Sequence, residues 1–453
     1  TLSGGAIAAI PNRRGPDALV VKAGILKSPT LDVEAKGTAR IAFNGTQRAQ
    51  SDLPASAWKF LHDVASGGGE VFNVFRSPLS GTEVLWSTLA GAGAQEVIAA
   101  TGVITEQLAG YANVVSAAGA VKANALTYAD SLLSPLQRAA FVSATVSGAL
   151  YTGTANTADP STPFTLGATA TGSSPATMDW YETIIFPRAL HEYERQLVRE
   201  YLAARYGITA PALTGPDRDI MSLLPFAWLE AAANTSSGGK VAGFVDRARP
   251  GHSFSQPNPS NQVNVPATSS DFNGQLTVST AGAGKFYDSN LPAAAWTFMH
   301  DGAGAEWVQL SKQTAAATCR IFGSAAIKSQ SGVINQASEA GDAIFTVVNG
   351  TAVSFSGSLS NGSPLNAPVA LSYSLTNRAW TIRNSNNVSA TGVPGGLSSA
   401  SPPATMRLLG IAAASSQEWQ GDWASTLVFD RILSEPERNK RAAALTAKYG
   451  KGL

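Results

Sequence analysis

Short runs of alternating apolar and polar residues dominate the chain, and clusters of Gly, Asn, Ser and Pro separate them. The clearest runs are 70–75, 82–86, 141–146, 343–348, 353–355, 369–373 and 379–383. A period of two places every second side chain on one face of a β-strand. Many such strands, spaced by turn residues, predict an antiparallel sandwich or barrel.

One pair of neighbouring runs has the form of a hairpin. The run 371–375 is followed by Thr376-Asn377-Arg378 and then by the run 380–382. A short connection that contains Asn, between two alternating runs, is typical of a tight turn. The pattern therefore predicts two antiparallel strands here.

Two segments break the strand pattern and predict helices. Ser434 and Glu437 have the spacing of a capping box, with Pro436 in the first turn and Gly450 after the last. The segment 191–207 has a similar pattern, with acidic residues at its start and Gly207 at its end. An apolar stripe runs along it from the preceding residue, at Leu190, Leu197, Val198, Tyr201 and Leu202. Each helix is expected to cover one edge or end of a sandwich.

A long internal repeat decides the number of domains. The segment 53–63, Leu-Pro-Ala-Ser-Ala-Trp-Lys-Phe-Leu-His-Asp, recurs at 291–301 as Leu-Pro-Ala-Ala-Ala-Trp-Thr-Phe-Met-His-Asp, at an offset of 238. Residues 180–207 match 423–450 at a constant offset of 243, and the opening Ser3 matches Ser237 at an offset of 234. The offset changes only from 234 to 243 along the chain, which requires few net insertions. We therefore interpret the chain as two copies of one domain.

The repeat sets the expected boundaries: a first module at 1–208, a stiff Pro/Gly linker at 209–225 and a second module at 226–453. The second module opens with a strand-like run at 226–231, ahead of its Ser-Gly-Gly. The first module has only Thr1 and Leu2 before the same motif, so its opening strand is expected to be missing. An unpaired strand would then be exposed, which predicts self-association through that edge.

Composition narrows the classes of partner. Charged residues make up 14% of the chain, and 32 basic against 31 acidic side chains give a net charge of +1. A surface so close to neutral creates no electrostatic field that would attract phosphate backbones or anionic lipid. Neither nucleic acid nor membrane is therefore predicted as a partner. The single Cys319 excludes an internal disulfide and a cysteine zinc cage, and it is predicted to be buried. No apolar span and no secretory leader is recognisable.

The closing pattern of each module resembles a known family. A strand with Phe-x-Arg-x-Leu, a helix with Glu-x-Glu-Arg and a terminal Ala-x-Tyr-Gly are similar to the end of concanavalin A-like jelly rolls of the laminin-G type. The motifs Trp228-Leu-Glu-Ala231, Asp246-Arg247 and Phe-Asn-Gly, at 272–274 and 43–45, resemble the bacterial and phage branch. This implies an all-β fold, with two tandem antiparallel jelly-roll β-sandwiches, each closed by one C-terminal α-helix.

The carboxylates argue against an enzyme. A glycoside hydrolase needs two carboxylates across one cleft, and the catalytic relatives of this fold carry them on a strand with Glu-x-Asp-x-Glu or a near variant. No such run exists, and Asp179 and Glu182 have the wrong parity for one face of a strand. Glu192 and Glu194 suit the start of a helix. We therefore predict no catalytic residues.

The recurring His62-Asp63 and His300-Asp301 pairs allow two interpretations. Each pair could orient a ligand or a metal, so both histidines are candidate binding residues. The favoured alternative is structural: Trp58, Phe60 and His62 would share one strand face, with the histidine at the strand end.

Tryptophan supplies the other candidates, because an aromatic face can stack on a sugar. Trp58, Trp296, Trp180 and Trp423 recur as pairs and are predicted to lie in the core. The unpaired Trp307, Trp380 and Trp419 are the candidates for exposed contacts, with packing as the alternative. No cofactor and no metal is predicted. Calcium, common in lectin-like relatives, would have to use Asp217 and Asp219, or Asp246 and Asp422.

Together these features predict a non-catalytic structural or binding protein. The first hypothesis is a phage virion surface component, in a capsid decoration or a tail, which binds other subunits of that assembly. The alternative is a secreted or cell-surface glycan-binding protein, and a glycoside hydrolase ranks below both. The expected location is the virion surface or the extracellular space.

Overall fold

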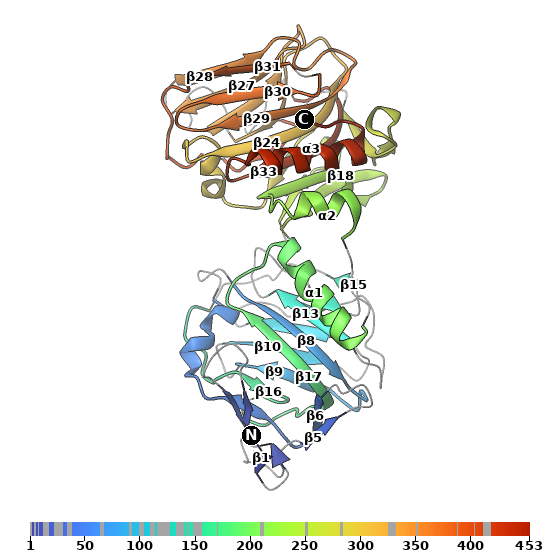
Figure 1. The fold of residues 1–453 in the computed structure, drawn as a ribbon, viewed down its shortest axis with the longest axis vertical. Helices are drawn as coiled ribbons and strands as arrows, with labels where there is room; N and C mark the ends of the chain where they lie inside the picture. The colour runs from blue at the N-terminus through green and yellow to red at the C-terminus, as the bar shows by residue number, and fades with distance from the viewer. Residues whose placement is uncertain are drawn as a thin grey trace. The chain divides into compact units, whose positions relative to one another are not determined.

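The computed structural model describes most of the chain, and the described residues are 2–3, 6–7, 9–11, 18–21, 30–33, 39–63, 68–89, 93–98, 104–108, 114–115, 127–132, 140–142, 145–147, 156–169, 171–208, 213–249, 252–280, 284–324, 332–349, 352–386, 388–402, 404–410 and 418–453. The chain divides into two compact units, residues 1–190 with 194–212 and residues 191–193 with 213–453. Both are built mainly from antiparallel β-sheet with few helices (Figure 1). The fold is therefore all-β in character, as the alternation predicts.

The first unit contains two large antiparallel sheets. One has the strand order β12 (Val114–Val115), β11 (Ile104–Leu108), β10 (Ala94–Ile98), β9 (Glu83–Ser87), β16 (Thr165–Leu166), β7 (Ala49–Ser51), β4 (Ala18–Val21), β3 (Ala9–Pro11). The other has the order β15 (Thr145–Ser147), β14 (Ala140–Val142), β13 (Thr127–Leu132), β8 (Glu70–Arg76), β17 (Thr177–Phe186), β6 (Ala39–Asn44), β5 (Thr30–Val33). A separate pair joins β1 (Leu2–Ser3) to β2 (Ala6–Ile7).

The second unit also has two layers of β-sheet, but here one strand pairs with both layers. The strands of the two layers therefore form one continuous 16-stranded sheet. Its order is β28 (Ala352–Leu359), β27 (Ala343–Asn349), β26 (Gly332–Ala337), β25 (Cys319–Gly323), β32 (Arg407–Leu408), β23 (Tyr287–Ser289), β20 (Ser253–Ser255), β19 (Lys240–Asp246), β18 (Ala227–Ser237), β33 (Gly421–Phe429), β24 (Ala305–Gln313), β29 (Pro368–Leu375), β30 (Trp380–Asn384), β31 (Ser389–Gly392). The strand β22 (Leu276–Thr280) pairs with β33 and with β21 (Ala267–Thr268).

The linking strand is β18. Its first half, Ala227–Glu230, pairs with β33, and its second half, Asn234–Ser237, pairs with β19. A register shift between Leu229 and Asn234 separates the halves. Such irregularities bend a strand and let it leave one layer for the other.

Alternate residues of the central strands supply two separate cores in each unit. In the first unit, Val71 and Phe75 of β8 face the opposite sheet, where they pack with Trp86. Phe72 and Val74 of the same strand face the other way. The period of two therefore separates a core between the sheets from a core beneath a helix.

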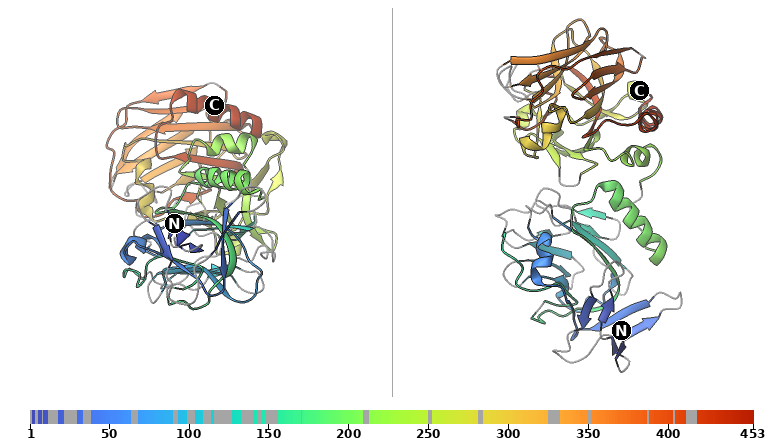
Figure 2. Two further views of the ribbon diagram at one scale, coloured as in Figure 1. Left: turned by 60° about the horizontal axis from the view of Figure 1, so that its bottom comes forward. Right: turned by 60° about the vertical axis from the view of Figure 1, so that its left-hand side comes forward.

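The long helices lie across sheet faces. Leu190 and Leu202 pack with Phe72 and Val74 under α1 (Glu192–Tyr206), and in the second unit Leu445 of α3 (Glu435–Tyr449) packs with Val308 and Leu310 of β24. In Figure 2 α3 is on the outer side of its sheet. The expectation that these helices cover an edge or end of a sandwich is wrong, because the apolar residues on the outward face of β8 and β24 need a cover.

Helix boundaries follow the capping signals. Ser434 is the N-cap of α3, and a capping box joins it to Glu437. Gly450 closes the helix with a left-handed φ of 68°, which a residue with a Cβ adopts at a cost. The predicted helix at the end of the second module is confirmed. No helix in the described part of the chain has the length and apolarity to cross a membrane.

The hairpin prediction is also confirmed, since Leu375 pairs with Trp380 and Tyr373 with Ile382. The run 141–146 forms two paired strands, β14 and β15, and not one.

Part of the predicted linker, 209–212, lies outside the described residues. Residues Gly215–Met221 form a helix, α2, which packs against α3. The module boundaries and the missing opening strand stay predictions.

A buried ion pair fastens each long helix to its sheet. In the first unit Arg195 of α1 donates two hydrogen bonds to Glu70 of β8, at 2.6 and 2.7 Å, and both side chains are 1% exposed. Glu70 also accepts the backbone N–H of Leu190 at 2.5 Å. In the second unit Glu306 of β24 accepts from Arg438, Arg441 and the N–H of Leu433. The repeat aligns Leu190 with Leu433 and Arg195 with Arg438, so the same contact recurs at matching positions.

Cys319 of β25 supplies a prediction for the native protein. The side chain is fully buried, and burial raises the pKa of its thiol to about 11. Only about a thousandth of the thiol is then ionised at pH 8, and the thiolate is the reactive form. A disulfide reagent should label the native chain at least roughly a hundred times more slowly than the chain unfolded in urea. Equal labelling rates, followed by absorbance, would contradict this burial.

Candidate functional site

The two recurring histidines lie at the ends of short helices. His62 is the C-cap of a 3-10 helix at Ala55–Leu61, and His300 is the C-cap of another at Ala293–Met299. The predicted strand is therefore wrong. Proline at position 54 or 292 precedes each helix, where a fixed φ favours a helical turn, and this signal outweighs the apparent alternation.

Both imidazoles act as internal hydrogen-bond donors. His62 donates from Nε2 to the carbonyl of Ala158 at 2.8 Å, and His300 donates to the carbonyl of Ala400 at 3.0 Å. Both side chains are completely buried, and burial lowers the pKa of each ring, which keeps it neutral. Each histidine thus holds a distant loop against its helix. A buried neutral ring of this kind is not presented to a ligand.

Two of the three candidate tryptophans are inside the second unit. Trp307 is 0% exposed and stacks on Tyr373 at 5.4 Å between ring centroids, and Trp419 is 1% exposed. The exposed role predicted for these two is wrong: alternate side chains of β24, Trp307 among them, face the core between the layers, and Trp419 packs in the same core. Trp380 alone keeps partial exposure, and its indole packs over Gly392 of the neighbouring strand.

The prediction that Asp179 and Glu182 cannot lie on one face of their strand is also wrong. A register shift in β17 between Trp180 and Glu182 puts both carboxylates on the helix-facing side of the sheet. There Asp179 pairs with Arg40 at 2.5 Å. Glu182 accepts a hydrogen bond from Tyr206 at 2.7 Å. Each carboxylate is therefore bound to its own partner, and the pair does not face a shared groove.

Sequence reasoning missed a serine, a histidine and an aspartate that meet in the second unit. His252 donates from Nδ1 to Asp246 at 2.5 Å, and its Nε2 accepts from the hydroxyl of Ser289 at 3.0 Å. This order matches the chain of groups that activates a serine nucleophile. However, His252 is 0% and Ser289 6% exposed, and the serine oxygen also accepts the N–H of Leu291. The three residues form a closed polar link inside the protein and leave no room for a substrate.

The candidate calcium ligands are occupied by protein groups. Asp217 binds Arg247 and Lys448, each at 2.6 Å, and these cations lower the pKa of its carboxyl. Asp246 accepts two backbone N–H groups besides His252. Across the described ranges no three His, Cys, Asp or Glu side chains gather as metal ligands.

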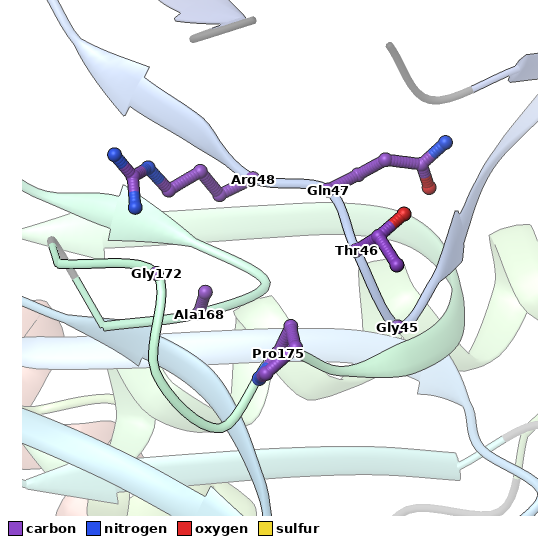
Figure 3. Close-up of a pocket in the computed structure, with 7 residues that line it drawn as sticks. All are labelled: Gly45, Thr46, Gln47, Arg48, Ala168, Gly172 and Pro175. Atoms are coloured by element: carbon purple, nitrogen blue, oxygen red, sulfur yellow. The ribbon is translucent and has the colours of Figure 1, made fainter. Parts of the chain in front are cut away.

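A small hollow in the first unit has a different character. It measures about 90 Å³ and lies between the loop that joins β6 to β7 and the loop that joins β16 to β17 (Figure 3). Its lining consists of Gly45, Thr46, Gln47, Arg48, Ala168, Gly172 and Pro175. These groups are a cation, an amide, a hydroxyl and small side chains.

Backbone hydrogen bonds fix the walls of this hollow. Gly45 donates to the carbonyl of Ala176 at 3.1 Å, and Ala176 donates to that of Gly167 at 2.7 Å, so the two loops are tied together. Gly45 and Gly167 both have φ of 81°, and a Cβ at Gly167 would lie 2.7 Å from Phe43. The glycines therefore permit a close approach that other residues would prevent. No predicted site residue lies here, and only the Gly-rich spacing in the sequence hints at the loops.

The comparisons with known proteins are limited to fold likeness. No protein-family model and no curated protein matches the chain. Among solved structures, the CBM40 of the Ruminococcus gnavus IT-sialidase, bound to α2,3-sialyllactose, is 11% identical over 38% of this chain and 96% of its own, with a TM-score of 0.31. Domains LG4-5 of the mouse laminin α1 chain are 11% identical over 80% of each chain, with a TM-score of 0.24. A GH54 α-L-arabinofuranosidase is 14% identical over 52% of this chain and 66% of its own, with a TM-score of 0.35.

The Phe-Asn-Gly motif, on which part of the resemblance rests, does not occupy the same structural position in the two units. Phe43 and Asn44 lie in β6, which pairs with β17, whereas Phe272 ends a 3-10 helix and Asn273 caps it with a φ of 56°. In the second unit the partner of β33 at the matching place is β22. The two Phe-Asn-Gly segments are therefore not equivalent positions.

Proposed function

We propose that this chain is a non-catalytic binding protein that works as a subunit of a virion surface or of another extracellular assembly. Asp179, Glu182 and Glu194, which were considered for catalysis, are each bound to protein partners. The hollow described above is lined by no carboxylate, imidazole or thiol. A site with binding groups but without an acid, a base or a nucleophile suits recognition and not turnover.

The observation that carries the assembly role is the edge of β17 in the first unit. Residues 177–180 of β17 pair with β6, and among the described strands none pairs with residues 182–186 on that side. The matching segment of β33 is covered there by β18. Residues 182–186 are accordingly half-buried, whereas residues 425–429 are buried throughout.

An open edge of this length favours a second copy of the chain as its partner. Alternate residues among the five at 182–186 direct their backbone N–H and C=O away from β8, and no described strand pairs with these groups on that side. Such free donors and acceptors extend a sheet readily. Two copies related by a two-fold axis can pair their β17 strands antiparallel, because a two-fold axis brings the same patch of each copy together.

Light scattering tests this contact. We expect the chain, of 46.7 kDa, to form a dimer. A variant with a copy of residues 227–236 fused directly ahead of Ser3, which supplies the strand in cis, should be monomeric. An unrelated Gly-Ser extension of equal length is the control and should leave the dimer intact. Monomers in all three cases would refute the edge contact.

Two further measurements address the wider proposal. Copurification with virion or surface proteins would support the assembly role. Incubation with a panel of polysaccharides should release no reducing ends, and release that a single Asp or Glu substitution abolishes would make the protein a hydrolase. The second candidate function, glycan binding, is favoured by the polar lining of the hollow.

A further inference from the structure

Arg48 brings a positive charge to the hollow, and among the residues that the structure describes no carboxylate forms an ion pair with it. Its side chain points to the side of the Gly172 turn, and Gln47 points to the opposite side of the same segment (Figure 3). No acidic residue is among the seven that line the hollow. Arg195, by contrast, has a buried carboxylate as its counter-charge.

Two nitrogens of this guanidinium have no acceptor. Nε and Nη1 of Arg48 are out of contact with solvent, and neither makes a hydrogen bond within the protein. A buried N–H without an acceptor costs free energy, and a charged donor costs more. A ligand that supplies oxygen acceptors and a negative charge would recover this cost once the Arg48 side chain turns these nitrogens toward the hollow.

We infer that the hollow is a binding subsite for the carboxylate of an acidic saccharide, with Arg48 as the group that recognises the charge. A planar carboxylate matches a guanidinium in geometry and charge, and the bond is charge-assisted. This inference deepens the glycan-binding alternative. It does not depend on the β17 edge, which is a separate surface.

The surroundings favour a saccharide over a peptide. Around Arg48 the side chains are small or polar, and none is a large apolar group of the kind that anchors a peptide. The loop that supplies Ala168, Gly172 and Pro175 also carries the hydroxyls of Thr169, Thr171 and Ser173. Within the lining itself, the hydroxyl of Thr46 and the amide of Gln47 are polar groups that suit a ligand rich in hydroxyls.

The test uses the full chain and NMR of the arginine Nε–H and backbone amide signals. D-glucuronate should shift the Arg48 Nε–H and the amides of Gly45 and Gly172. D-glucuronamide, its neutral counterpart of nearly equal shape, should bind at least about ten-fold more weakly. The substitution Arg48→Gln should abolish the glucuronate shifts. Arg48→Lys, which keeps the charge and loses the guanidinium, should weaken binding.

Arg378→Gln is the matched control, because it removes the same charge from an exposed turn and should change nothing. Equal binding of glucuronate and glucuronamide by the wild-type chain would overturn the inference, and that comparison needs no variant to fold. Acetylglycine binding as tightly as glucuronate would overturn the saccharide class. Neutral sugars that bind without shifting Arg48 would refute this subsite and leave the glycan-binding alternative standing.

Discussion

Replacing Arg195 by alanine is expected to lower the free energy of unfolding of the first unit by about 3–5 kcal/mol. The substitution leaves Glu70 buried at 1% exposure and removes the positive charge and the two hydrogen bonds that Arg195 supplies. A buried carboxylate that has lost its cationic partner is far less stable than one that keeps it. Urea denaturation followed by circular dichroism measures the loss.

Arg188→Ala is the matched control for this prediction. Arg188 binds Glu194 through two hydrogen bonds, but its side chain is 54% exposed. An exposed pair contributes about 0.5 kcal/mol or less. The double substitution Glu70→Leu with Arg195→Met should recover most of the loss, because it removes both charges. If Arg195→Ala and Arg188→Ala lower the free energy of unfolding equally, the buried ion pair stabilises the fold no more than the exposed one, which would contradict the prediction.

The second large effect concerns pH and Glu96. This carboxyl lies between the sheets of the first unit, where Oε2 accepts from Trp86 at 2.7 Å and from Asn73 at 2.9 Å, and Oε1 has no partner. Burial raises its pKa from 4.5 to about 7, and the two hydrogen bonds offset part of that rise. In the folded chain the protonated form is therefore favoured at every pH below about 7.

The sign of the pH dependence follows from this shift. The folded state binds the proton more tightly than the unfolded chain, so the stabilisation is complete below pH 4.5 and is lost as the pH rises through 7. The difference in pKa corresponds to about 3 kcal/mol between pH 4 and pH 8.

Glu96→Gln should remove that loss. One amide oxygen can accept from both Trp86 and Asn73, and the side chain carries no charge at any pH. We expect the variant to match the wild type near pH 5 and to exceed its stability at pH 8, in denaturation curves recorded across this range. Glu83→Gln, the same change on β9, is the control and should keep the wild-type slope. A wild-type curve that is flat from pH 5 to 8 would contradict the prediction.

Local signals in the sequence were sufficient for many elements. The capping box at Ser434 and Glu437 sets the start of α3, and the turn at 376–378 sets a hairpin, because each depends on neighbouring residues alone. Alternation correctly predicts strands such as β8 and β27. The repeat aligns Arg195 with Arg438, and the structure gives both the same carboxylate contact.

Features that depend on distant contacts were not accessible in this way. The bulge in β17 reverses the parity argument for Glu182, and no sequence signal marks it. The burial of Trp307 and Trp419 depends on which face of a strand meets the other layer. The hollow at Arg48 needs two loops that are about 120 residues apart to meet through backbone hydrogen bonds. Short-range patterns therefore predict elements better than sites.

The pairing of β18 constrains how the second unit forms during synthesis. Ala227–Glu230 leave the ribosome about 200 residues before their partner in β33, Ser425–Val428, has been made. Contacts so far apart along the chain form slowly, and an early strand must wait for its neighbour. The nascent unit thus carries an unfinished layer until β33 has been made, and during that time it most needs protection from other chains.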